Sequence, residues 1–571
     1  MSESLHWIDG LVIVLYLLAI TVLGLLAGKK VKGSADFFMP RRFGKGMMIM
    51  HAFGTGTASD QAVSVASATA KNGLSGIWFQ WLWLLMTPVY WVIAPIMRRF
   101  RATTTADVYE LRFDRSVGML FALVGIANMI VKIGLMLKGA GALIDSGTGG
   151  AINANWAIVI TTILFLIYGL SGGLGAAIIT DFVQGILTLV FSFLLLPFVL
   201  KAVGGIGGAQ AILSADHADK LSLVAPGNIG VFWILMMSIQ VIVGIVAFPS
   251  AMGNCAAGRT EMEGRIGYMC GTFIKRICTM AWCLTGLGAM AWYLQQGVAL
   301  ESIQPDSVYG DMARQFLPVG LLGVFIASLL AAIMSSCDSF MIAASGLFTE
   351  NLYRQAVKAQ SPAHYLMVGR LASFLIVGLG MAFAFYLPGV IAGLKIWLKI
   401  APMMGVAFWL GLIWRRMTVA GAWASALGGF GTWWLTAQPS FVAWVAKLPL
   451  AASLKLTVTN SQGTSIYEPW GILAYLCVAT ILGITLSLLT RSVPKQKLDL
   501  FYRLTRTPVS EGEVLEAPCQ IPAGVETPER SMWLQRGGFE IPQPSTVTLA
   551  GFFVGCLGVV ALIGAFVLIV G

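Results

Sequence analysis

The chain has 571 residues, of which 57% are hydrophobic and only 11% are charged, and its formal net charge is +11. Soluble domains carry roughly a quarter charged residues, so this composition excludes a soluble fold and indicates an all-α polytopic membrane protein. The positive charge needs no nucleic-acid partner, because most of it lies in short loops on one side of the predicted bilayer.

Apolar runs of about 20 residues, the length of one membrane-spanning helix, recur along the chain. We expect fourteen spans in a cell membrane, at 9–27, 47–70, 75–97, 116–143, 155–174, 177–200, 229–252, 268–294, 317–350, 365–389, 391–414, 417–437, 469–490 and 547–570. The N-terminus lacks the positive leader of a cleavable signal, so the first span is expected to remain in the protein.

The loops between the spans differ sharply in positive charge. Loop 28–46 contains Lys29, Lys30 and Lys32 among six Lys and Arg residues, whereas loops 144–154 and 296–316 are poor in both. Because cytoplasmic loops carry the excess of Lys and Arg, this pattern predicts that both termini lie outside the cytoplasm.

The second span is interrupted by residues that a membrane helix normally avoids. Its middle reads HAFGTGTASDQ from His51 to Gln61. Helix-breaking residues are tolerated at membrane depth only where the freed backbone groups find a partner, a cavity or an ion. We interpret the run as a helix that unwinds around Gly54 to Gly56 and offers carbonyls to a cation, with Asp60 as a functional ionisable group. Close helix packing on a Gly/Thr face is the alternative.

The spans fall into two groups of five that enter the membrane from opposite sides, which is the inverted-repeat plan of secondary transporters. The first span of the second group has Gly244 and Pro249, matching the interrupted first span of the first group. The predicted divisions are an N-terminal helix and loop at 1–45, repeats at 46–201 and 202–416, two further helices at 417–490, a cytoplasmic linker at 491–546 and a last helix at 547–571.

The ninth span carries the chemistry that would complete a cation site. Ala332, Ser335, Ser336 and Ser339 recur at three- and four-residue spacing and so share one helical face. Neutral oxygen ligands suit a monovalent ion such as Na+, because Ca2+ and Mg2+ sites use more carboxylates. The alternative is that these hydroxyls bond to the preceding turn of their own helix.

Several motifs resemble the sodium/solute symporter family. They are the run from Ala331 to Ser339, the continuation from Ala343 to Tyr353, the run from Tyr168 to Gln184, the segment from Asp36 to Leu74, and the stretch from Pro402 to Arg416. The resemblance covers about residues 9–490. It implies a LeuT-like 5+5 inverted-repeat core with one extra N-terminal and three extra C-terminal helices, and transport driven by a sodium gradient.

The resemblance also implies ligands. The main sodium site would use carbonyls of Gly54, Thr57 and Ala332 and the hydroxyls of Ser335 and Ser336. A second sodium found in some members would use Asp181, Ser335, Asp338 and Ser339. For Asp181, a helix cap or a salt bridge near the inner surface is the alternative.

The solute site implied by the resemblance contains Gly56, Gln61, Gln80 and residues near Ala247. The sugar-transporting members carry more polar groups here, whereas this chain is apolar from Val243 to Phe248. Buried Lys132 and Lys138, together with Lys395 and Lys399, admit two accounts. One is an anionic solute met by Lys132 or Lys138. The other, which we favour, pairs Lys132 with Asp60 and lets Lys395 and Lys399 extend to the outer surface.

These features predict a sodium-coupled symporter, not an enzyme, that imports a small organic solute by alternating access. A carboxylate, an amino acid and a sugar all remain open as the solute, and so does the oligomeric state. One alternative is a transporter-like sensor that signals through the linker, which is expected to be partly disordered. A proton-translocating subunit is less favoured, because the predicted spans contain almost no Glu.

Overall fold

The long apolar runs fold as helices, and short hairpins are the only sheet among the residues described. The computed structural model describes residues 5–28, 37–225, 229–460, 463–513, 515 and 517–571. Lys29, Lys30, Lys32 and Asp36 lie outside them. Ten helices in the described part are long and apolar enough to cross a membrane, or eleven if one bent pair is a single span. The all-α polytopic prediction is confirmed, while the number fourteen stays a prediction.

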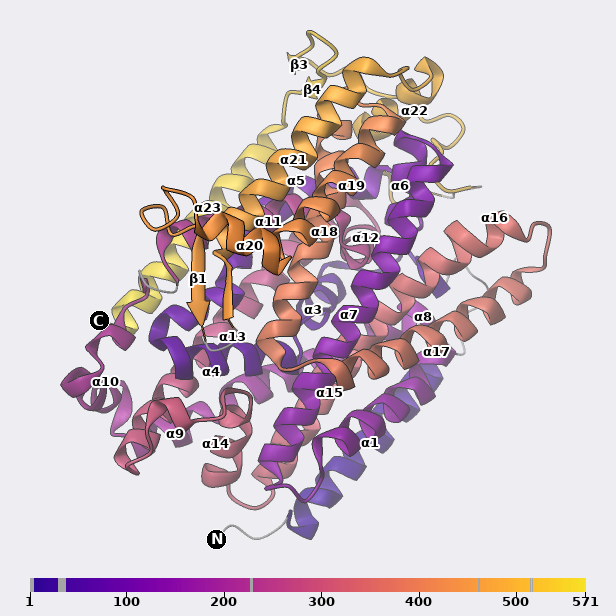
Figure 1. Cartoon of the computed structure of the whole chain (residues 1–571). Coiled ribbons are helices and arrows are strands. Elements are labelled where there is room, and N and C mark those ends of the chain that lie inside the picture. Colours follow the sequence, from indigo (N-terminus) through magenta and orange to yellow (C-terminus); the bar gives the residue numbers. More distant parts are fainter. Residues whose placement is uncertain (1–4, 29–36, 226–228, 461–462, 514, 516) are drawn as a thin grey trace.

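The elements follow the chain as Figure 1 shows. The N-terminal part contains α1 (Trp7–Gly28), α3 (Lys45–Gly54), α4 (Ser59–Asn72), η1 (Gly73–Ile77), α5 (Trp78–Arg99), α6 (Thr105–Arg112), α7 (Arg115–Gly147), α8 (Ala154–Leu194) and α9 (Leu196–Ala202). The middle contains α10 (Gly205–Asp216), η2 (Ala218–Leu221), α11 (Val231–Gly244), η3 (Ile245–Ala247), α12 (Pro249–Ala256), α13 (Glu261–Gln295), η4 (Leu300–Ser302), η5 (Pro305–Ser307), α14 (Val308–Phe316), α15 (Leu321–Gly346), η6 (Leu347–Tyr353), α16 (Arg354–Ala356), α17 (Pro362–Tyr386) and α18 (Val390–Ile413). The C-terminal part contains α19 (Val419–Thr436), α20 (Pro439–Ala446), β1 (Thr457–Asn460), β2 (Gly463–Ile466), α21 (Glu468–Leu489), α22 (Lys495–Arg506), β3 (Met532–Leu534), β4 (Ile541–Pro542) and α23 (Thr546–Val570).

Both predicted helix interruptions are present. The first lies between α3, which ends at Gly54, and α4, which begins at Ser59. The second lies between α11, which ends at Gly244, and α12, which begins at Pro249, with a bend of 70°. Proline lacks the backbone N–H that would continue the helix, and this accounts for the restart at Pro249. The prediction that both helices unwind at these glycines and proline is confirmed.

The predicted spans 155–174 and 177–200 are not separated by an ordinary loop. They are two helices that meet at a kink at Gly173, whose φ is +59°, and the bounds of α8 include both. A side chain there would lie 2.6 Å from the carbonyl oxygen of Phe37, so only glycine fits this crossing.

The two termini lie at the same end of the bundle, near α10 and α14, whereas α6 and α22 lie at the opposite end (Figure 1). Near the N-terminus, the Asp9 carboxylate accepts from the backbone N–H groups of Gly320 and Gly323 at 2.8 and 2.7 Å. Near the C-terminus, the Gln210 amide donates to the Val570 carbonyl at 2.5 Å. We call the end that carries α6 and α22 the basic face, because Arg112, Arg503 and Arg506 lie in the last turns of these two helices.

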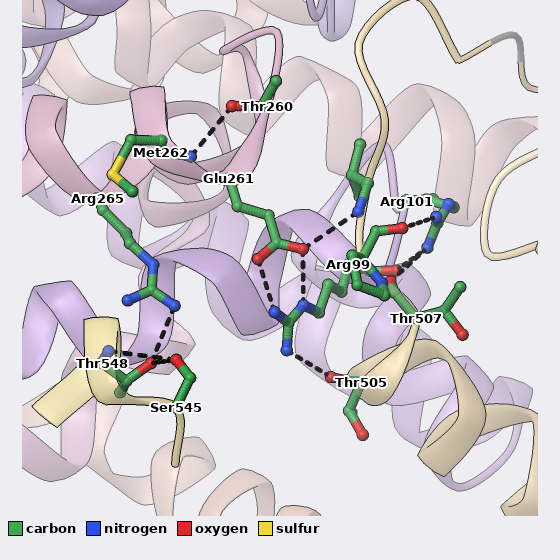
Figure 2. A network of polar contacts seen from close by, with 12 residues as sticks. Arg99, Arg101, Thr260, Glu261, Met262, Arg265, Thr505, Thr507, Ser545 and Thr548 are labelled. Atoms are coloured by element: carbon green, nitrogen blue, oxygen red, sulfur yellow. Dashed lines mark hydrogen bonds and ion pairs between the residues drawn. The ribbon is translucent and has the colours of Figure 1, made fainter. Parts of the chain in front are cut away.

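The predicted linker is more ordered than we expected. Residues 495–513, here called the α22 segment, pack on the basic face. Leu498, Phe501 and Tyr502 are buried because their three- and four-residue spacing gives α22 one apolar side. Figure 2 shows how arginines fix the segment: Arg99 pairs with Glu261 at 2.7 Å and donates to the Thr505 carbonyl at 3.1 Å.

Glu513 is expected to hold the end of the α22 segment in place. Its carboxylate pairs with Arg101 at 2.7 Å, and both side chains are almost fully buried. Removing one partner of a buried pair costs about 3–5 kcal/mol, so Glu513→Ala should expose the segment to limited proteolysis many-fold faster. Glu511→Ala is the matched control, because its pair with Arg259 is exposed and worth at most about 1 kcal/mol. Equal cleavage rates in the two variants would contradict this role.

Candidate functional site

The break between α3 and α4 leaves backbone groups that α15 satisfies. The Ser336 hydroxyl donates to the Gly54 carbonyl at 2.9 Å and accepts from the Gly56 N–H at 3.1 Å. Gly56 has a φ of +82°, a conformation that costs other residues roughly 1–2 kcal/mol. All three residues are buried. The predicted meeting of the interrupted helix with the serine face of the ninth span is therefore confirmed.

A buried carboxylate adjoins the same break. Asp181 on α8 accepts from the Ser335 hydroxyl and lies 2.6 Å from Nδ1 of His51 on α3. Gly54 lets these helices approach, because a Cβ atom there would lie only 2.6 Å from the Ser335 oxygen. Asp181 thus lies beside the break, and its pair with His51 leaves the predicted alternative of a salt bridge open.

The remaining predicted sodium ligands divide into two sets. Ser339 joins the cluster, because the Thr55 hydroxyl donates to its oxygen at 3.3 Å. Thr57 turns its hydroxyl back to the Phe53 carbonyl, and Ala332 lies one turn before Ser335 on α15. Asp338 points toward Gly169 on α8. We call Gly54, Asp181, Ser335, Ser336 and Ser339 the sodium cluster, after the ion that the sequence predicts here, and regard the other positions as peripheral to it.

The donor chemistry of the sodium cluster fits a monovalent cation. Four of its five residues offer neutral oxygens, and one offers a carboxylate. Within the described ranges, the side chains of His, Cys, Asp and Glu form no group of three or more that could hold a metal. Divalent hard cations and transition metals want such groups. The cluster is suited to Na+ by this test.

A small cavity of about 60 Å³ lies beside the break, and we call it the central cavity. Small-molecule sites are commonly larger, roughly 300–1,000 Å³, so a solute would bind here only when the surrounding helices have moved apart. Gly56, Gln61 and Lys132 line it, as predicted for the solute site. Trp83, Phe248 and Trp397 line one part of its wall, with ring centroids 4.9–5.8 Å apart.

Other predicted solute contacts lie behind this wall. Gln80 and Ala247 are not among the described residues that line the central cavity, although Ile245 and Phe248 beside Ala247 are. Asp60 forms an ion pair with Lys132 at 2.6 Å, so the predicted internal pairing is confirmed.

The other lysines considered for an anionic solute have different surroundings. Lys138 lines a separate, larger opening with Asp145 and Asp306. Lys395 and Lys399 pair with Glu468 of α21 at 3.0 and 3.6 Å, and their side chains are 40% and 26% exposed, which agrees with the predicted extension toward the surface. One carboxylate from a helix outside the predicted repeats is thus shared by two ammonium groups.

Two residues of the site were missed by sequence reasoning. His51 stood in the run already noted, but its partner Asp181 is 130 residues away. Lys275 lies on α13, lines the central cavity and donates to the Thr55 carbonyl at 2.5 Å. A Lys-Arg pair, Lys275 and Arg276, in the middle of a predicted span was the signal that could have identified it.

Comparison with known proteins gives the relationships of this chain. The model of the family described as "Sodium:solute symporter family" matches residues 37–429. The osmoregulated proline transporter OpuE of Bacillus subtilis is 24% identical over 509 residues, covering 85% of this chain and 96% of that protein. The sodium/pantothenate symporter of Haemophilus influenzae is 25% identical, covering 72% and 86%, and the sodium/glucose cotransporter of Vibrio parahaemolyticus is 24% identical, covering 74% and 83%.

Solved structures agree on the fold. A sodium-coupled sialic acid symporter in an outward-open state matches with a TM-score of 0.69 at 18% identity, covering 86% of this chain and 99% of its own. The nucleobase-cation-symport-1 transporter Mhp1 matches with a TM-score of 0.51 at 11% identity, covering 82% and 99%. At these identities the likeness concerns the fold alone, which is LeuT-like.

Proposed function

Because the chain belongs to the sodium:solute symporter family, it is a sodium-coupled transporter and not an enzyme, and we propose that it imports a small organic solute by alternating access. Relatives named for proline, pantothenate and glucose transport are 24–25% identical to this chain, and such distant identities leave its solute open. The basic face is proposed to lie in the cytoplasm, with both termini outside.

Sodium is proposed to bind in the sodium cluster. The observation that carries this proposal is the Ser336 hydroxyl on the Gly54 carbonyl at 2.9 Å, which joins the broken helix to α15. With an ion between them, hydroxyl and carbonyl oxygens would both turn their lone pairs to the cation, and the α3–α4 break would be held against α15. Thr57 and Ala332 are proposed to complete the shell, and Asp338 with Ser339 and Asp181 to serve a second ion.

Sodium binding and solute binding are proposed to be coupled because both sites include the break between α3 and α4. The solute is proposed to bind in the central cavity, whose wall includes Gly56 of the same break. An ion shifts a conformational equilibrium only if it binds one state better than another, and an ion that fixes the break also fixes this wall. Sodium would therefore favour the state that binds solute, and its loss on the low-sodium side would release both.

Sodium should stabilise the purified protein before any solute is known. At about 100 times its Kd, a bound ion adds about 2.7 kcal/mol to the folded state. We expect the Tm to rise when NaCl replaces choline chloride at constant ionic strength, and KCl to act like choline. Equal Tm values in the three salts would oppose the proposal. Counterflow of a labelled solute in proteoliposomes then separates a carrier from a sensor.

A further inference from the structure

The central cavity carries an excess of positive charge that its own side chains do not neutralise, and we propose that it binds the carboxylate of a small organic anion through Lys275 and Arg276. This inference rests on the proposed function, because it names the class of solute for the same cavity. A neutral sugar and a zwitterionic amino acid are the solutes that it excludes.

The first step is the count of charges around the cavity. Three of its lining residues are cationic, namely Lys132, Lys275 and Arg276, and none of its described lining residues is acidic. Lys132 is neutralised by Asp60 at 2.6 Å. Neither Lys275 nor Arg276 has a carboxylate within 4.0 Å in the described part of the chain. Two buried cations therefore remain without an ion-pair partner.

The second step is what these two cations contact instead. Lys275 donates to the Thr55 carbonyl at 2.5 Å, and Arg276 donates to the carbonyl of Gln80. Carbonyl oxygens satisfy hydrogen bonds but leave the charge uncompensated, and buried charges are normally paired. The nearest buried carboxylate of the sodium cluster, Asp181, is held by His51 and Ser335. Binding of Na+ there would add a further positive charge.

The third step is the set of polar atoms that lack partners around the same cavity. Gln61 Oε1, Asn254 Oδ1 and Arg276 Nε are buried without a hydrogen bond, and all three residues line the cavity. Such atoms are costly unless a ligand or water satisfies them. The two amide oxygens would accept from a hydroxyl group, while the guanidinium would donate to a carboxylate. A hydroxy acid presents both kinds of group.

The fourth step is the apolar part of the wall. Tyr90 and Tyr268 stack at 3.9 Å, and Trp83, Phe248 and Trp397 form the aromatic cluster described above. These rings would pack against a hydrocarbon or aromatic substituent. A free ammonium group on the solute would face Lys275 and Arg276, and like charges in a desolvated site are unfavourable. The cavity therefore matches a 2-hydroxy acid better than the corresponding 2-amino acid.

The test uses the purified full-length protein in NaCl and two matched trios. Lactate is compared with lactamide and alanine, and mandelate with mandelamide and phenylglycine. The three compounds of each trio share one carbon skeleton. The acid is an anion, the amide is neutral, and the amino acid is a zwitterion. Affinities come from titration calorimetry and from the shift in Tm. We expect at least one acid to bind more tightly than its amide and its amino acid by about 30-fold or more, the factor expected for one buried charged contact.

Variants assign the effect to a residue. Lys275→Met should abolish the preference for the acid over the amide, whereas Lys275→Arg should retain it. Lys201→Met is the control, because this exposed lysine on α9 lies away from the cavity. The wild-type comparison needs no variant, so the proposal can be overturned even if Lys275→Met does not fold. It is overturned if no acid binds, or if an amide or an amino acid binds as tightly as its acid.

The same titrations separate this inference from the proposed function. If NaCl raises the Tm while no acid is preferred, the anionic solute is wrong and sodium coupling stands. If NaCl has no effect on the Tm while lactate or mandelate binds through Lys275, the sodium cluster is wrong and the anion site stands.

Discussion

Replacing Ser335 and Ser336 together by alanine is expected to raise the sodium concentration for half-maximal stabilisation by on the order of 100-fold. Hydrogen bonds or ligands to a charged group contribute about 1.5–3 kcal/mol each, and each 1.4 kcal/mol is a factor of ten. Both hydroxyls lie at the break, one on Asp181 and the other on the Gly54 carbonyl. Titration of the Tm with NaCl, or equilibrium binding of labelled sodium, measures the change.

Ser345→Ala provides the matched control for this double variant. Ser345 is equally buried on α15, but its hydroxyl donates to the Ile342 carbonyl of its own helix at 3.1 Å. Its removal should leave the sodium titration unchanged. If the double variant titrates like Ser345→Ala and the parent, sodium does not bind between α3 and α15.

Asp60→Asn is expected to give the largest loss of stability among single substitutions around the central cavity, because Asp60 pairs with Lys132 in its wall. It leaves the Lys132 ammonium buried, only 2% exposed, with no carboxylate partner. Breaking a buried ion pair costs about 3–5 kcal/mol, mostly because one charge remains uncompensated. Thermal unfolding of the detergent-solubilised protein should show a strongly lowered midpoint and reduced yield.

A double variant separates charge from packing at this pair. Asp60→Asn combined with Lys132→Met removes both charges, so it should recover much of the loss caused by Asp60→Asn alone. Asp219→Asn is the surface control, since Asp219 is 73% exposed in its pair with Lys220 at 3.5 Å. If the double variant is less stable than Asp60→Asn alone, an uncompensated charge on Lys132 is not the cause of the lost stability.

The interruptions of the two core helices could be predicted from the sequence because the signal is local. Gly54, Gly56, Gly244 and Pro249 weaken a helix wherever it packs, and membrane depth makes the freed backbone groups costly. The serine face of α15 could also be predicted, because helical periodicity places Ser335 and Ser336 together before any partner is known. That these two serines would face the break between α3 and α4 was predicted only from the family resemblance.

The residues that were missed depend on distant partners. The rotation of α13 about its own axis decides whether Lys275 faces the break or the lipid. This rotation depends on how α13 packs against α3, so it could not be predicted from the sequence of α13 alone. His51 was visible, but its role follows from Asp181, which α8 brings to it across the bundle. For α22, the spacing of Leu498, Phe501 and Tyr502 was a readable signal, which the Pro- and Glu-rich surroundings concealed.

The shared carboxylate of Glu468 has a consequence for movement. It binds both lysines of α18, and Trp397 lies between them on the same helix, in the wall of the central cavity. The position of that tryptophan is thus tied to α21, a helix outside the proposed repeats. Any tilt of α18 that opens the cavity must either carry α21 with it or separate one carboxylate from two ammonium groups. Because both lysines are partly exposed, each pair opposes such a tilt by about 1 kcal/mol or less, and Glu468→Gln would remove this resistance.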